Sequence, residues 1–229
     1  MDVRVTEPDV SPLAVQGPKA VDLMADLFGA AIRDLGFFKF GWFDFQGTKQ
    51  LIARSGYSRQ GGYEIYLNGG SLGSALWDAV WQAGQPYNIT PGCPNLIERI
   101  EGGLFSYGNE MTRDNNPLEI GLGKFCTLDG SIDYIGSQAL RRIATEGIRR
   151  DIRGVTFDGG PCPTCSSPWP VMVGALKVGQ ITSGIWSPRL KTNVGLSLID
   201  TGYDDIGQPV TVHSRDGLAR VGQITSLPM

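Results

Sequence analysis

The last third of the chain limits the possible folds most, because its sequence pattern changes from residue 151 onward. Short runs of apolar and alternating residues follow one another at close spacing there, separated by Gly, Pro and Asp: IRGVTF, ALKVGQIT, NVGLSLI, QPVTVHS and LARVGQIT. Several short strands with turn residues between them are typical of an all-β barrel or sandwich. We therefore predict a small β-barrel or sandwich domain over residues 151–229.

The first part of the chain mixes two periodicities. Apolar residues alternate at Leu13 and Val15, the chain then turns, and apolar residues recur at helical spacing until Gly29. Further along come a strand-like run, a hairpin and a second helix: FKFGWFDFQG, RSGYSRQGGYEIYL and SLGSALWDAVWQAG. This order is typical of an α+β fold with an antiparallel sheet. We predict such a domain for residues 1–115, followed by a connecting segment with a short helix over residues 116–150.

The charge balance argues against two classes of partner. The 229 residues include 20 basic and 23 acidic ones without a block of like charge, so we expect neither nucleic acid nor an anionic membrane surface as a partner. No apolar run approaches the ~20 residues of a membrane span. The opening MDVRVTEPDV lacks the basic and apolar regions of a signal peptide. We therefore expect a cytoplasmic location.

Cys162 and Cys165 form a CxxC pair within GGPCPTCSSPWP. A zinc site would need two more ligands from Cys93, Cys126 or His213, which are distant in the sequence. The neighbouring prolines predict an irregular loop rather than the helix start at which a redox CxxC normally lies. We therefore predict a loop without a metal ion. A single histidine also disfavours a Ser/His/Asp or Cys/His mechanism.

The return strand of the hairpin at residues 54–67 carries two polar groups on one face. Tyr63, Ile65 and Leu67 alternate as an apolar face, so the two-residue period of a strand places Glu64 and Tyr66 together on the other. That face is either simply solvated or lines a pocket. In a pocket, a carboxylate beside an aromatic ring is suited to a ligand with N–H groups or positive charge.

The stretch TPGCPNLIERIEGGLFSYG is predicted to be a third helix, with an apolar arc of Leu96, Ile97, Ile100 and Leu104. Arg99 falls at the edge of its apolar arc, one turn before Gly103, whose missing side chain leaves room for a neighbour or a ligand. The alternative is that Arg99 only covers the core with its aliphatic stem. On the preceding helix, Trp77 and Trp81 are expected to pack into the core.

Four stretches together resemble a known family. In the same order and over almost the whole chain, they resemble the aminomethyltransferase (glycine-cleavage T-protein) family of tetrahydrofolate-dependent enzymes: SGYSRQGGYEIYL, ERIEGGLFSYGNEM, NPLEIGLGKFCTLDGSIDYIGSQAL and VGQITSGIWSPRLKTNVGLSLI. Within the family, further details are most similar to the dimethylsulfoniopropionate demethylases: RSGYSRQGGYEIYL, PGCPNLIERIE and SPLAVQGPKA. T-proteins proper tend to carry a TGYTGEDG type of turn where this chain has SGYSRQGG.

The resemblance implies a folate-binding α+β domain, present in part, followed by the β-barrel, with tetrahydrofolate as the cofactor. The resemblance implies that Glu64 binds the pterin and that Arg99 and Tyr57 make further contacts with the cofactor. It also implies that Tyr66 lies beside a small-molecule methyl donor. Trp186 is a further ring that could hold a cationic methyl donor. The implied activity is one-carbon transfer to tetrahydrofolate, with dimethylsulfoniopropionate or a related sulfonium as the methyl donor. Glycine-cleavage-type aminomethyl transfer and folate binding without catalysis are the alternatives.

The resemblance also implies that members of the family carry a further N-terminal segment. We therefore expect the chain to be a fragment or truncated product, to work with a partner chain that supplies the segment, or to have a reduced binding role. Apolar surface left open by the missing segment would favour a homo-oligomer.

Overall fold

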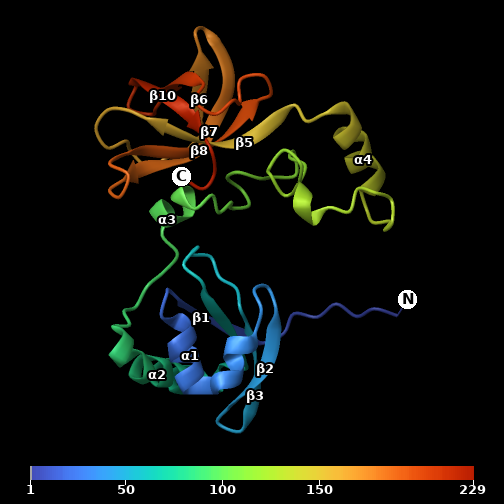
Figure 1. Cartoon of the computed structure of the whole chain (residues 1–229), viewed down its shortest axis with the longest axis vertical. Helices are drawn as coiled ribbons and strands as arrows, with labels where there is room; N and C mark the ends of the chain where they lie inside the picture. Colours follow the sequence, from blue (N-terminus) through green and yellow to red (C-terminus); the bar gives the residue numbers. More distant parts are fainter. Residues whose placement is uncertain (1) are drawn as a thin grey trace. The chain divides into compact units, whose positions relative to one another are not determined.

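The computed structural model describes residues 2–229, which form two compact units that divide between Pro94 and Asn95. The first unit contains an antiparallel sheet with helices, and the second contains a closed β-barrel (Figure 1). The predicted α+β fold with a C-terminal barrel is therefore confirmed. The domain boundaries predicted after residues 115 and 150 do not coincide with the division into two units, and they stay predictions.

The first unit is built on a four-stranded antiparallel sheet in the order β1-β4-β3-β2. The strands are β1 (Val10–Gln16), β2 (Phe40–Phe45), β3 (Thr48–Ala53) and β4 (Gly62–Asn68). Two α-helices and three 3₁₀ helices complete the unit: α1 (Ala20–Phe28), α2 (Gly73–Gly84), η1 (Ala30–Asp34), η2 (Gly70–Leu72) and η3 (Gln85–Tyr87).

Helices α1 and α2 pack on one face of this sheet. Tyr63, Ile65 and Leu67 of β4 are at most 1% exposed and share one core with Met24 of α1 and Leu76 of α2. The predicted alternation of β4 is therefore confirmed, and it turns every second residue of the strand toward the opposite face.

The prediction that Trp77 and Trp81 pack into the core is wrong. They are 47% and 38% exposed, because the buried arc of α2 is formed by Leu76 and Val80. A residue that follows an arc position by one lies about 100° further round the helix, and this rotation carries both indoles out of the core.

The second unit ends in a six-stranded closed barrel in the order β10-β5-β8-β7-β6-β9. The strands are β5 (Arg150–Phe157), β6 (Trp169–Val173), β7 (Leu176–Ser187), β8 (Thr192–Asp200), β9 (Pro209–His213) and β10 (Ala219–Thr225). Of the two architectures left open by the sequence, the barrel is the one observed. Strand β6 was not predicted, because prolines flank Trp169 on both sides; yet Trp169 is 2% exposed and packs edge-to-face on Phe157 in the barrel core.

The second unit also contains α3 (Leu96–Glu101), η4 (Gly123–Phe125) and α4 (Ser137–Glu146). Helix α3 is shorter than predicted: the Asn95 side chain caps its start by accepting a hydrogen bond from the Glu98 N–H at 2.8 Å, and Gly103 adopts a left-handed φ of +64° just beyond its end. A Cβ at Gly103 would lie 3.2 Å from Leu227, so a neighbouring side chain, not a ligand, lies against this glycine. Within residues 2–229, no helix is long and apolar enough to cross a membrane.

Candidate functional site

The face of the first sheet opposite α1 and α2 carries two rows of side chains. Strand register places one row as Ala14, Glu64, Ala53 and Phe40, and the next row as Pro12, Tyr66, Leu51 and Trp42. Phe40 and Trp42 are 63% and 60% exposed, while Glu64 and Tyr66 are half-buried. Glu64 therefore lies between two alanines on a mostly apolar face, with aromatic side chains at the β2 edge.

The Glu64 carboxylate is held from one side only. Ser55 Oγ donates a hydrogen bond to Oε2 at 2.5 Å, and the Tyr66 hydroxyl lies 3.5 Å from the same oxygen. Within the described chain, no hydrogen-bond donor reaches Oε1. A carboxylate can accept about four hydrogen bonds, so Glu64 keeps most of its acceptor capacity for a ligand.

Gln16 of β1 fixes the loop between β3 and β4, which carries Ser55. Its side-chain Nε2 donates to the carbonyl oxygens of Ser55 at 3.0 Å and Tyr63 at 3.2 Å, and its Oε1 accepts from Ser58 Oγ at 2.7 Å. Glycine suits position 56, because a Cβ there would lie 2.0 Å from the Gln16 amide and would displace a group that makes three hydrogen bonds. The SGYSRQGG turn thus positions Ser55, which in turn orients Glu64.

The environment of Tyr66 keeps its hydroxyl protonated. Partial burial raises the pKa of the Tyr66 phenol, and the neighbouring Glu64 carboxylate raises it further. A protonated phenol leaves the ring face electron-rich and uncharged, which suits it to a cation. Tyr57 lies in the loop between β3 and β4 and is 37% exposed, and its contact with the cofactor stays a prediction.

Arg99 belongs to the second unit and is buried, with its guanidinium engaged by protein groups. Its Nη1 donates to Glu110 Oε2 at 2.7 Å and to the Leu104 carbonyl at 3.1 Å, and its Nη2 donates to Ser183 Oγ at 2.5 Å. The side chain is therefore neither spread over the core surface nor solvated. Its predicted contact with the cofactor stays a prediction.

Glu110, the partner of Arg99, is completely buried and receives several hydrogen bonds. Besides Arg99, it accepts from the Ser106 N–H at 2.8 Å, from Thr182 Oγ1 at 3.2 Å and from Ser183 Oγ. Both of its oxygens are occupied, so this carboxylate joins α3, the segment after it and β7.

Trp186 lies on β7 of the second unit, opposite Asn193 of β8, and is half-buried. The structure thus brings Glu64 and Tyr66 together, with Tyr57 in the adjoining loop, and places Arg99 and Trp186 in the other unit. The role of Trp186 stays a prediction.

Sequence reasoning missed Phe40, Trp42 and Glu110. A signal for the first two was present, because the alternation in FKFGWFDFQG places Phe40 and Trp42 on the face opposite Phe43 and Phe45. Glu110 gave no such signal, because it lies in an irregular segment without periodicity.

The CxxC loop is tied to the barrel by buried polar side chains. Asn193 Oδ1 accepts from the Cys162 N–H at 2.8 Å, and Arg220 Nη1 donates to the Gly160 carbonyl at 2.6 Å. Burial raises the pKa of the Cys165 thiol to about 11, so the free thiol is neutral near pH 7. Over residues 2–229, no group of three or more His, Cys, Asp or Glu side chains is arranged to hold a metal ion. The metal-free loop stays a prediction.

Comparison with known proteins connects both units to one family. The family model described as GCVT N-terminal domain matches residues 1–130, and the one described as glycine cleavage T-protein C-terminal barrel domain matches residues 150–229.

Two curated relatives differ in similarity. The chain is 49% identical over 220 residues to dimethylsulfoniopropionate demethylase DmdA of Ruegeria pomeroyi, a match that covers 96% of this chain and 60% of that protein. It is 35% identical over 211 residues to the aminomethyltransferase of Caldanaerobacter subterraneus subsp. tengcongensis, covering 90% of this chain and 55% of the relative. The chain therefore spans somewhat more than half the length of these relatives.

Among solved structures, the crystal structure of the glycine cleavage system aminomethyltransferase T from Bartonella henselae superimposes with a TM-score of 0.77 at 22% identity. The match covers 95% of this chain and 58% of that one. At this level of identity the likeness shows a shared fold.

Proposed function

The chain belongs to the glycine cleavage T-protein family, and from this premise we propose that it binds tetrahydrofolate and acts in the transfer of a methyl group to it. The observation that carries the proposal is the Glu64 carboxylate, which lies half-buried on the sheet face opposite α1 and α2, with no hydrogen bond to Oε1 from residues 2–229.

The surroundings of Glu64 suit a flat heterocycle. Ala14 and Ala53 flank it on the neighbouring strands, and these small side chains leave room for a planar ligand beside the carboxylate. A pterin presents a ring N–H beside an exocyclic amine, and an ionised carboxylate can accept both hydrogen bonds in parallel. When bound, tetrahydrofolate supplies the nucleophilic N5 that accepts the methyl group.

The chain itself mainly has to align the methyl donor with the cofactor. A sulfonium releases a neutral thioether when its C–S bond breaks and the methyl carbon bonds to N5, so direct displacement needs alignment rather than a general acid. Tyr66 lies on the same face as Glu64 with its hydroxyl protonated, and such a neutral ring attracts a cationic methyl donor by about 0.5–2 kcal/mol. The lone histidine, His213, is exposed on β9 and takes no part.

Dimethylsulfoniopropionate or a related sulfonium is the proposed methyl donor. The support is the 49% identity to a dimethylsulfoniopropionate demethylase, against 35% to an aminomethyltransferase. Aminomethyl transfer is the second candidate, because the family and the fold are shared. A turnover assay with tetrahydrofolate and dimethylsulfoniopropionate, in which methyl-tetrahydrofolate is followed, distinguishes the two. Folate binding without transfer from dimethylsulfoniopropionate or from an aminomethyl donor would support the non-catalytic alternative.

Calorimetric titration with tetrahydrofolate tests the role of Glu64. Glu64→Gln should weaken binding at least about tenfold, because one N–H of the pterin loses its charged acceptor. Glu146→Gln on α4, an exposed site in the second unit, is the matched control and should leave the Kd unchanged. An unchanged Kd in Glu64→Gln would overturn the assignment. The partner chain or second copy expected from the sequence stays a prediction, which the mass of the chain in solution tests.

A further inference from the structure

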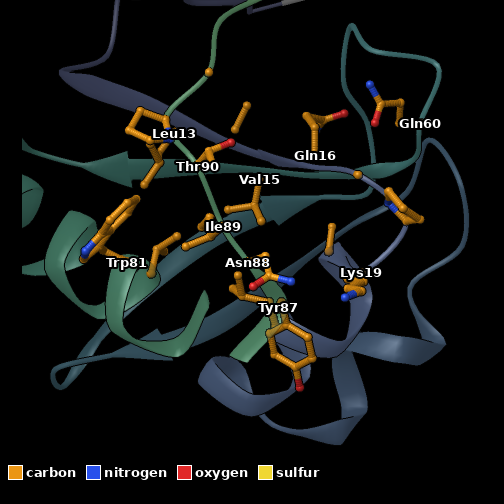
Figure 2. A pocket seen from close by; sticks show the side chains of 18 of the residues that line it. Leu13, Val15, Gln16, Lys19, Gln60, Trp81, Tyr87, Asn88, Ile89 and Thr90 are labelled. Carbon is orange, nitrogen blue, oxygen red and sulfur yellow. The ribbon is translucent and has the colours of Figure 1, made fainter. Parts of the chain in front are cut away.

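The first unit contains a cavity that the proposed function does not use. It has a volume of about 510 Å³, and its walls come from β1, the start of α1, α2 and the segment 87–92 (Figure 2). This volume is in the range of small-molecule sites. None of the described residues that line it is Glu64, Tyr66 or Tyr57.

One wall of the cavity is aromatic. Trp77 and Trp81 lie one turn apart on α2, and both line the cavity while remaining 47% and 38% exposed. The segment 87–92 is attached to the end of α2, because the Ile89 N–H donates to the Gly84 carbonyl at 3.1 Å. Two indoles beside a fixed backbone provide flat apolar contact area at a small entropy cost.

The other end of the cavity is polar and carries positive charge. Lys19 is the one charged residue among the described lining residues, and Figure 2 shows it on the same side as Asn88, away from Trp81. Neither side chain has a hydrogen bond or ion pair within residues 2–229. Gln16 also lines the cavity, but its amide is already bonded to the loop between β3 and β4. Lys19 and Asn88 are thus polar groups available to a ligand at this end, and the Thr90 hydroxyl lines the cavity as well.

We propose that this cavity binds a small planar aromatic carboxylate. The ring lies against the indoles of Trp77 and Trp81, and the carboxylate accepts hydrogen bonds from the Lys19 ammonium and the Asn88 amide. The charge of Lys19 selects against a cationic ligand, and an uncharged aromatic molecule lacks the charge that attracts this ammonium. The site is independent of the proposed transfer to folate.

The test uses naphthalene-2-carboxylate as the probe and the chain labelled with 5-fluorotryptophan. The five tryptophans give separate ¹⁹F signals, which single Trp→Phe variants assign. The signals of Trp77 and Trp81 should shift and saturate as the probe is added, while that of Trp169 in the barrel core stays fixed. Absence of a saturable shift at Trp77 and Trp81 would overturn the proposal.

Two comparisons then test recognition of the anion. Lys19→Gln should weaken binding of the probe about fivefold, whereas Lys49→Gln, an exposed lysine outside the cavity, should not. Since Lys19 makes no side-chain capping hydrogen bond to α1, the substitution keeps the helix. The neutral analogue 2-naphthylmethanol should also bind about fivefold more weakly than the carboxylate. Equal affinity for both probes, or an unchanged affinity in Lys19→Gln, would contradict a carboxylate site.

Discussion

Two glutamates, one in each unit, show how differently the same side chain can be used. Glu110 is 0% exposed and accepts hydrogen bonds from Arg99, Ser106, Thr182 and Ser183 on both oxygens. Glu64 is half-buried, and within residues 2–229 its one short hydrogen bond comes from Ser55, on one oxygen. The first carboxylate is saturated by the protein, and the second retains capacity for another molecule.

The comparison indicates where to look for chemistry. A buried carboxylate that is saturated by its own chain joins elements together, since any ligand would first have to displace internal hydrogen bonds. Arg99 belongs to the same hydrogen-bond network, in which both of its Nη atoms donate. The open face around Glu64 has no such competition, so it is the stronger candidate for cofactor binding.

The largest difference in stability is expected between two single variants, in which glutamine replaces one glutamate or the other. Glu110→Gln should destabilise the second unit by about 3–5 kcal/mol, because it leaves the buried Arg99 without its counter-charge. Glu64→Gln should change the free energy of unfolding by no more than about 0.5 kcal/mol, since the group is half-exposed. Denaturant unfolding, with hydrogen exchange to locate the weakened strands, measures both. Equal losses in the two variants would remove the distinction between a structural and a binding glutamate.

An intermediate effect is expected in the loop that orients Glu64. Gly56→Ala places a Cβ against the Gln16 side chain and should lower the free energy of unfolding by about 2–3 kcal/mol. In Gly61→Ala, in the same loop, the Cβ meets no atom within 4 Å. This variant should lose about 1 kcal/mol, from backbone strain alone. Denaturant unfolding gives both values. Only Gly56→Ala should also weaken folate binding, because it displaces Ser55. Equal effects on folate binding would show that Gln16 does not organise the site.

The smallest effect concerns a third carboxylate, which is exposed but saturated. Hydrogen bonds from Ser214 and then from Arg220 lower the pKa of Asp216 from 3.8 to about 2. Because the folded pKa lies below the unfolded one, the stabilisation is complete above about pH 4 and is lost as the pH falls toward 2. Asp216→Asn should therefore flatten the acid side of the stability curve of the barrel. An unchanged pH dependence between 4 and 2 would show that these hydrogen bonds do not stabilise the folded state.

Parts of this picture could be predicted from the sequence because they follow from local period. Alternation in β4 places Glu64 and Tyr66 on one face whatever else the chain does, and closely spaced short strands predict the barrel. The motif resemblance supplied the roles of these residues. Trp77 and Trp81 were misjudged because residue type was given more weight than position, although Leu76 and Val80 already define the buried arc of α2.

Other parts could not be predicted, because they depend on contacts between distant segments. Glu110 meets Ser183 across 73 residues, and no periodic pattern links the two. Strand β6 is hidden by prolines that normally end strands, and it is recognisable only through its pairing with β7 and β9. The cavity beside α2 likewise depends on segments 13–23 and 87–92 meeting.

The central claim is that Glu64 accepts the paired N–H groups of the pterin, and a cycle that changes protein and ligand together tests it most directly. Calorimetry would compare tetrahydrofolate with an analogue in which a methyl group replaces the exocyclic amine, using the unchanged chain and Glu64→Gln. If the carboxylate bonds this amine, each single change should weaken binding at least about tenfold, and both together should cost little more than one, because they remove the same interaction. Losses that multiply to about a hundredfold would show that the two groups act independently, which contradicts the claim.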